Sequence, residues 1–136
     1  MNEIFFPLFG FIDIYGNWEA QLDFSYFERG TSSNVWFNNH IDEFINRKDE
    51  LTGFFHTHPN GMSHYSQTDF NTMQIWCDML GKDLLCLIGC PEIHGWWFSK
   101  SQEQMLLGQV EEFNLTKFML KGYCNGKRPI FTRKSI

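Results

Sequence analysis

The chain has 136 residues, of which 43% are hydrophobic and 20% charged, and this composition predicts a single globular domain over residues 1–136 with its own core. No apolar run reaches the roughly 18 residues that a membrane span needs. Residues 1–116 hold all 16 acids and 5 of the 11 basic residues, a net charge of −11 that disfavours binding to the phosphate backbone of nucleic acid.

The two ends of the sequence differ from its body. The first residues, "MNEIFFPLFGF", lack the basic region and the small-residue cleavage site of a signal peptide, so we expect a cytoplasmic protein. Residues 117–136 carry the other 6 basic residues and no acid. This basic segment can meet an acidic partner, or it can lie on the acidic body of its own chain.

The first third of the chain is typical of a β-hairpin followed by a helix. Glu3–Ile14 is apolar and β-prone, Gly16 and Asn17 supply turn chemistry, and Glu19–Tyr26 alternates between apolar and polar residues. After the loop "RGTSSN", Val35–Arg47 has apolar residues at helical spacing, and Ser33 or Asn34 could cap that helix.

The remainder alternates between strand and helix signals. In chain order these are a strand "LTGFFHTH" ending at Pro59, a helix over Asp69–Leu80 closed by Gly81, a strand "DLLCLIGC", its neighbour "GWWFS", an amphipathic helix over Gln102–Phe113, and a short strand near Ile130–Thr132. The fold class that we expect is mixed α/β (α+β), a twisted mixed sheet flanked by helices.

The four cysteines favour buried free thiols. Without a secretory signal, and with Cys77 and Cys86 inside apolar runs, a disulfide framework that also uses Cys90 and Cys124 is disfavoured. Cys86, Cys90 and His94 could form part of a zinc site, but their spacing fits no standard finger and a fourth ligand is missing.

The stretch "GFFHTHPNGMSHYSQTDF" collects the residues best suited to chemistry. His56 and His58, two residues apart in a strand, point to the same face, which is a common start to a zinc site. Asp69 can supply the third ligand if the loop over residues 60–65 returns the chain beside the strand end. The alternatives are ordinary strand-end histidines and a capping box, with Ser66 as N-cap and Asp69 three residues on.

These residues resemble a known signature. "HTHP", six residues and then "SQTD" match H-x-H-P-x6-S-x2-D of the JAMM metalloproteases (the JAB/MPN family) at every position. The resemblance implies an MPN-type fold, a Zn²⁺ ion on His56, His58 and Asp69, and Ser66 as the donor to the oxyanion. It covers the chain from Glu3 to about Phe98.

The family also requires a glutamate on an early strand, often within E-x-x-G-x-x-x-G. "EIFFPLFG" offers Glu3, although Phe6 stands where glycine is common and Pro7 is unusual in a strand. Glu19 and Glu28 are the rivals, but Glu19 is fully explained as a solvated residue of an alternating strand, so Glu3 is favoured as the catalytic base that the resemblance implies. A base so close to a chain end risks fraying unless later structure or a partner pins it.

The resemblance implies a zinc peptidase or isopeptidase. Relatives cleave after the C-terminal glycine of ubiquitin or a ubiquitin-like protein, in bacteria also within ubiquitin-like antiphage operons, and they bind the substrate tail by strand addition. The segment before His56 and the loop over residues 60–65, with Met62 and Tyr65, are the expected walls of the tail site. The alternatives are a RadC-like DNA-repair-associated domain, a non-catalytic MPN scaffold, and a structural zinc site closed by His64.

Overall fold

The computed structural model describes residues 3–13, 15, 17–30, 35–59, 61–62, 64–89, 93–99, 104–106, 110–114 and 119–123. Its elements are β1 (Glu3–Ile12), β2 (Asn17–Leu22), β3 (Glu28–Gly30), the 3₁₀-helix η1 (Asn38–His40), α1 (Ile41–Asn46), β4 (Leu51–Thr57), α2 (Gln67–Leu80), β5 (Leu84–Gly89), β6 (Ile93–Phe98), β7 (Gln104–Leu106), β8 (Val110–Asn114) and β9 (Met119–Tyr123). Within this part of the chain, neither α-helix has the length and apolar character that a membrane crossing requires.

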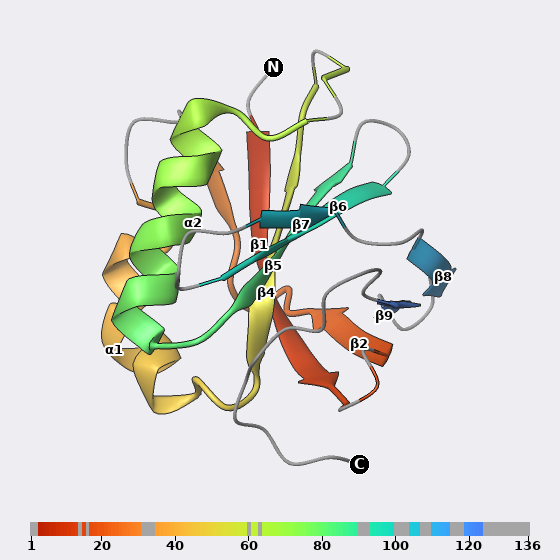
Figure 1. Cartoon of the computed structure of the whole chain (residues 1–136). Coiled ribbons are helices and arrows are strands. Elements are labelled where there is room, and N and C mark those ends of the chain that lie inside the picture. Colours follow the sequence, from red (N-terminus) through yellow and green to blue (C-terminus); the bar gives the residue numbers. More distant parts are fainter. Residues whose placement is uncertain are drawn as a thin grey trace.

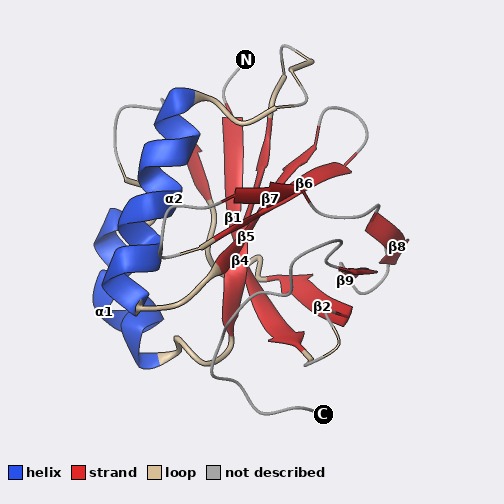
Figure 2. Cartoon of the chain, viewed as in Figure 1, coloured by secondary structure: helices blue, strands red, loops and turns tan. Residues whose placement is uncertain are grey.

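The strands form one mixed sheet in the order β7-β6-β5-β4-β1-β2-β9-β8, and β3 pairs with the first residues of β1. The β4–β5 pair is parallel, and α2 makes the crossover between these two strands, while every other described pair is antiparallel. Both α-helices lie on the same side of the sheet (Figures 1 and 2). The predicted mixed fold class is confirmed at this level.

Two apolar clusters lie on the two faces of the sheet. The cluster on the helix face joins Phe54 of β4 to Phe44 of α1 and Trp76 of α2, all fully buried. The second cluster, on the other face, draws on β1, β2, β5, β6 and β9 and includes Leu8, Trp18 and Leu87. The candidate site lies at one end of this sheet, where β1 begins and β4 ends.

The helix predicted over Val35–Arg47 is shorter than expected. Phe37 has a left-handed backbone (φ 58°), and the α-helical residues begin only at Ile41, after η1. This conformation is uncommon for a bulky residue, but Phe37 is fully buried and its N–H donates to Glu28 Oε1 at 2.8 Å. The proposed caps, Ser33 and Asn34, lie outside the described residues.

The strand predicted over Glu19–Tyr26 ends earlier, at Leu22. The carboxylate of Asp23 accepts the N–H of Ser25 at 3.0 Å, which is the turn chemistry that stops the strand. Pro7 is tolerated in β1 because it lies between the residues that pair with β3 and those that pair with β2, so on that side no ladder hydrogen bond needs its missing N–H. Its carbonyl accepts the N–H of Asp23 at 3.2 Å on the same side.

The helix predicted over Gln102–Phe113 is wrong. β7 and β8 occupy part of this range, with Leu106 opposite Trp96 and Phe113 opposite Leu120. Pairing with neighbouring strands overrides the helical spacing of the apolar residues, since short apolar runs fit either period. The strand expected near residues 130–132 lies outside the described residues.

Candidate metal centre

The two histidines of the motif stand where β4 ends. His56 is in β4 and His58 follows it, with the His58 N–H donating to the Gly89 carbonyl of β5 at 3.0 Å. Both imidazoles are buried, with 0% and 5% of the residue exposed. As the period of a strand predicts, their rings meet on one side of the sheet, with centroids 4.8 Å apart.

The start of α2 supplies the carboxylate. Ser66 is the N-cap, its Oγ accepts the Asp69 N–H at 3.0 Å, and Asp69 Oδ2 accepts the Ser66 N–H at 2.9 Å. The predicted capping box is therefore confirmed. The same Oδ2 atom also faces both imidazoles, so capping and convergence on the histidines coexist in one side chain.

Three atoms form a small triangle at this point. His56 Nε2 and His58 Nε2 are 3.1 Å apart, and Asp69 Oδ2 lies 3.0 Å from the first and 3.1 Å from the second. Two ligands of a tetrahedral zinc ion, each 2.0–2.1 Å from the metal, are about 3.4 Å apart. The three donors therefore already have nearly the spacing of one face of a zinc coordination tetrahedron.

Hydrogen bonding determines which nitrogen of His58 is protonated. His58 Nδ1 is 2.8 Å from the carbonyl oxygen of Met62, which can only accept, so Nδ1 carries the proton of the neutral ring. In that tautomer the Nε2 lone pair points at Asp69 Oδ2, so two potential ligand atoms face each other. The hydrogen bond to the Met62 carbonyl is of the kind that orients a histidine ligand in metal sites.

His56 is positioned by aromatic rings. Its ring stacks on Phe5 (centroids 5.3 Å apart, 17° between planes) and lies 5.0 Å from Trp36. Its Nδ1 is buried and has no hydrogen-bond partner among the described residues. The orientation of this imidazole therefore depends on packing, whereas that of His58 depends on a hydrogen bond.

Asp69 is ionised in this setting. Burial acts to raise the pKa of Asp69, but the imidazole of His56 and the Ser66 N–H outweigh it, and the pKa is lowered to about 2. A buried carboxylate that stays charged over the whole neutral range is a suitable oxygen ligand for a divalent cation.

Glu3 lies on the partly open side of the triangle. Its Oε2 is 3.5 Å from His58 Nε2, its side chain is 25% exposed, and its ligand atom lies within 4.8 Å of those of His56 and His58. Partial burial and the charge of Asp69 raise the pKa of Glu3, against the lowering effect of the two imidazoles. The chain thus brings together all five residues singled out from the sequence, and their chemical roles remain predictions.

The rival glutamates are placed elsewhere. The carboxylate of Glu28 accepts a hydrogen bond from the Phe37 N–H. Glu19 pairs with Phe11, eight residues along β1 from Glu3 and therefore roughly 25 Å away.

The other candidate ligands do not join this group. His64 packs against the rings of Tyr65 and Trp96, with centroids 4.1 and 5.0 Å away, and among the described residues it is not part of the cluster. Cys77 and Cys86 are buried free thiols, as predicted, and burial raises the pKa of each. Cys90 and Cys124 lie outside the described residues.

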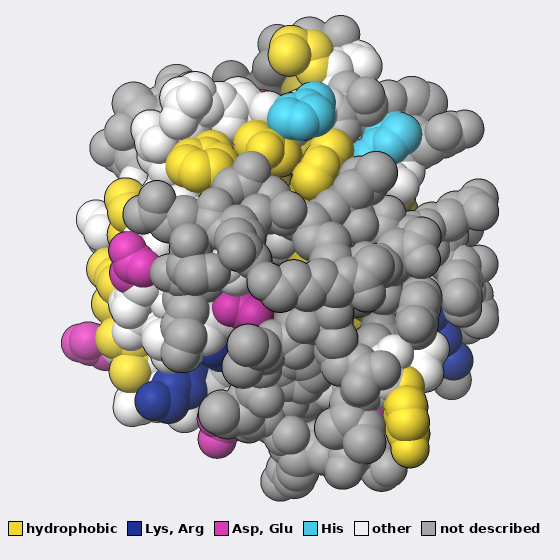
Figure 3. Space-filling view, in the orientation of Figure 1, with side chains coloured by type: hydrophobic (Ala, Val, Ile, Leu, Met, Phe, Trp, Pro, Cys, Tyr) yellow, Lys and Arg dark blue, Asp and Glu magenta, His cyan; other side chains and the backbone are white. Residues whose placement is uncertain are grey.

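Apolar side chains and histidines gather at the end of the molecule where β1 begins (Figure 3). Met62, whose carbonyl accepts a hydrogen bond from His58, is 53% exposed, and the ring of Tyr65 lies 5.3 Å from that of Trp96. The loop that carries these side chains is therefore fastened to the candidate metal centre.

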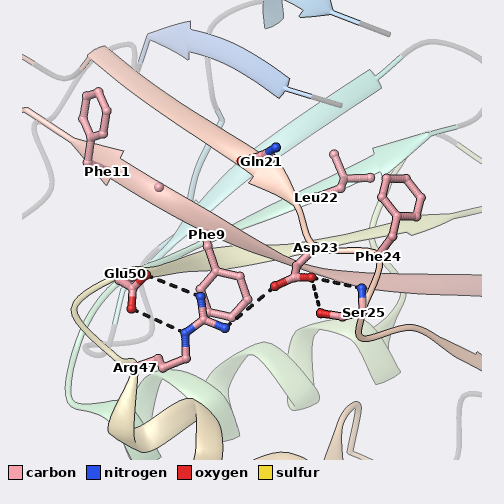
Figure 4. A pocket seen from close by; sticks show the side chains of 10 residues that line it. Phe9, Phe11, Gln21, Leu22, Asp23, Phe24, Ser25, Arg47 and Glu50 are labelled. Carbon is pink, nitrogen blue, oxygen red and sulfur yellow. Dashed lines mark hydrogen bonds and ion pairs between the residues drawn. The ribbon is translucent and has the colours of Figure 1, made fainter. Parts of the chain in front are cut away.

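A pocket of about 650 Å³ lies at the opposite end of β1 (Figure 4). Arg47 stacks on Phe9 with its guanidinium carbon 3.8 Å from the ring centre, and it pairs with Asp23 at 3.7 Å and Glu50 at 3.4 Å. These charged groups contact one another and tie the end of α1 to the turn after β2. The pocket wall thus has a structural role and is separate from the histidine cluster.

Comparisons of the chain with protein-family models, with curated proteins and with solved structures found no match. The JAMM resemblance therefore depends on the motif itself and on the geometry that the motif adopts.

Proposed function

We propose that this protein is a JAMM-type zinc metallopeptidase that cleaves a peptide or isopeptide bond after the C-terminal glycine of a ubiquitin-like protein. One observation carries the proposal. His56 Nε2, His58 Nε2 and Asp69 Oδ2 converge at 3.0–3.1 Å in a buried position, and a partly exposed glutamate stands beside them.

The donor set fits a catalytic zinc ion. Two neutral imidazoles and one carboxylate are a usual three-residue set, and such an ion supplies Lewis acidity and lowers the pKa of a water to about 7. Asp69 contributes a charge that is stable down to acidic pH, because its pKa is about 2. His58 contributes the Nε2 lone pair that the Met62 carbonyl orients.

Glu3 is suited to moving the proton. Its carboxylate is near the imidazoles and yet partly open to solvent, so it can reach a water at the site and exchange a proton with it. In the proposed reaction Glu3 Oε2 takes a proton from the attacking water. The same carboxyl group then returns the proton to the departing amine.

Ser66 can stabilise the developing oxyanion. Its Oγ accepts the Asp69 N–H, and this contact leaves the hydroxyl hydrogen to be donated. The capping interaction also fixes the hydroxyl at the rigid start of a 14-residue helix. Loss of one such donor typically lowers the rate about a hundredfold or more.

The substrate class comes from the resemblance, and two features of the chain support it. The loop with Met62 offers exposed apolar surface beside His58, as an extended tail needs. Residues 1–116 carry a net charge of −11, which disfavours the RadC-like alternative acting on DNA. The setting that we propose is a bacterial ubiquitin-like conjugation or antiphage system.

The test combines metal analysis with cleavage. Wild-type protein is incubated with a ubiquitin-like protein extended at its C-terminus, and the products are weighed by mass spectrometry. We expect a cut after the terminal glycine that a chelator abolishes and zinc restores. Glu3→Gln should keep zinc and lose activity, His56→Ala should lose both, and Glu19→Gln serves as the matched control with both intact. Activity retained in Glu3→Gln would exclude Glu3 as the base.

A closed, structural metal site is the second candidate, and the position of Glu3 favours it. The carboxylate lies close enough to both imidazoles to serve as a fourth ligand. The Glu3→Ala variant separates the two functions. A general base can be removed without loss of zinc affinity, whereas removal of a fourth ligand weakens zinc binding, and competition with a chromogenic chelator measures the difference.

A further inference from the structure

The first residues of β1 are attached to β4 in an unusual way. The β1–β4 ladder stops at the pair Phe5 and His56. Beyond that pair, the Ile4 N–H donates to the side-chain hydroxyl of Thr57, at 3.0 Å. On the β4 side of β1, the hydroxyl therefore extends the ladder by one contact, directly next to Glu3.

The other side of this strand end is held by a very short partner. β3 has only three residues, and it pairs Glu3 with Gly30, Ile4 with Arg29 and Phe5 with Glu28. A residue at the end of a strand opens more readily than one in its middle, since fewer backbone contacts must break. Glu3 occupies such an end, so each contact there has a large effect on where its carboxylate lies.

Because side chains alternate along a strand, the side chain of Thr57, between His56 and His58, lies on the opposite face of β4 from the candidate metal ligands. Its hydroxyl is consequently not a candidate ligand, and the Ile4 N–H is the partner that the geometry gives it. This single residue links the strand of the histidines to the strand of the glutamate.

We propose that Thr57 is a positioning residue, whose hydroxyl fixes the start of β1 and thereby holds the Glu3 carboxylate beside His58. The catalytic part of this inference depends on the proposed function, because it requires Glu3 to move protons. A site needs its groups held within about 0.5 Å, and a shift of 1 Å can lower a rate a hundredfold.

The experiment compares three variants of the full chain loaded with zinc. Thr57→Val keeps the shape and removes the hydroxyl, and Thr57→Ser keeps the hydroxyl. Thr52→Val is the matched control, since Thr52 is a buried threonine of the same strand whose hydroxyl donates to the Glu50 carbonyl at 3.2 Å, far from the cluster. Zinc content, kcat, KM and hydrogen exchange of the Ile4 amide are measured for each.

For Thr57→Val we expect Ile4 amide exchange to become at least about fivefold faster, the effect of losing one hydrogen bond. We expect kcat to fall roughly tenfold, with KM and zinc content unchanged. Thr57→Ser should stay close to wild type in its Ile4 exchange rate and in its kcat. Thr52→Val should leave the Ile4 exchange rate and kcat unchanged.

Three results would overturn the inference. The Ile4 amide of Thr57→Val could exchange as slowly as in the wild type. The loss of kcat in Thr57→Val could equal that in Thr52→Val, or it could be explained by a loss of zinc. If wild-type protein cleaves no substrate, the proposed function fails, and with it the catalytic part of this inference. Exchange at Ile4 still decides whether Thr57 holds the start of β1. The two failures are therefore distinguishable.

Discussion

Replacement of Asp69 by asparagine should remove a defined part of the pH dependence of folding. Asp69 is 1% exposed and its Oδ2 accepts the Ser66 N–H at 2.9 Å while facing both imidazoles. Asparagine keeps the size of the side chain and an oxygen for the Ser66 N–H. It removes the charge, so the variant separates the ionisation of Asp69 from its capping contact.

The direction follows from the pKa. The folded-state pKa of Asp69 is about 2, against an ordinary value of 3.8, so the folded protein favours the ionised form. This contribution is complete above pH 4 or so, and it is lost as the pH falls from about 4 to about 2. The decrease of the Asp69 pKa from 3.8 to about 2 corresponds to a free energy on the order of 2 kcal/mol.

Urea unfolding of the metal-free protein between pH 5.5 and pH 2 checks this value. The wild type should lose about 2 kcal/mol more unfolding free energy over this range than Asp69→Asn does. Other carboxylates contribute equally to both proteins, so the difference between the two curves isolates Asp69. Parallel curves for the two proteins would refute the assigned pKa and the role of His56 in lowering it.

Further expected outcomes concern the packing of β4 on β5, the hydrogen bond between Phe37 and Glu28, and the binding of zinc. In Gly53→Ala the new Cβ would lie 2.1 Å from the Leu85 carbonyl oxygen, so β4 and β5 must separate; we expect a loss of about 3 kcal/mol or more in urea unfolding. Gly30→Ala, with nothing within 4 Å, is the control and should lose much less. Glu28→Ala should cost about 1–2 kcal/mol by leaving the Phe37 N–H unpaired, and Glu28→Gln should restore most of it; equal losses would contradict this. Saturating zinc at 100 times its Kd should stabilise the wild type by about 2.7 kcal/mol, and a calorimetric scan that zinc does not shift would contradict a metal site.

The convergence of His56, His58 and Asp69 could be predicted from local rules. The period of a strand places His56 and His58 on one face, and a capping box fixes where Asp69 begins its helix. Both rules act within fourteen consecutive residues, 56–69, so no long-range information is needed.

Glu3 is different, because its place depends on register between strands far apart in the sequence. Glu3, Glu19 and Glu28 all lie in strands. The pairing of Phe5 with His56 brings Glu3 to the imidazoles and leaves Glu19 opposite the far end of β1, while Glu28 is excluded by its hydrogen bond to the Phe37 N–H. From the sequence, the family pattern offers Glu3, and Glu19 is set aside because a solvated position in an alternating strand explains it.

The errors in the fold also come from long-range contacts. Residues near Met105 and Phe113 have a spacing that suits an amphipathic helix, but strand partners at Trp97 and Leu120 determine the outcome. α1 starts late because Phe37 has a left-handed backbone, and Glu28 of β3 stabilises this conformation by accepting the Phe37 N–H. A periodicity within one segment carries no information about such partners.

The capping box of α2 bears on whether the chain folds before or after it binds a metal ion. Asp69 is held by Ser66 through two hydrogen bonds that need no metal, and His58 is held by the Met62 carbonyl. In zinc fingers the ion must arrive before the chain can fold. Here these contacts can form before any ion binds, so under the proposed function the supply of metal would control the activity of a protein that is already folded.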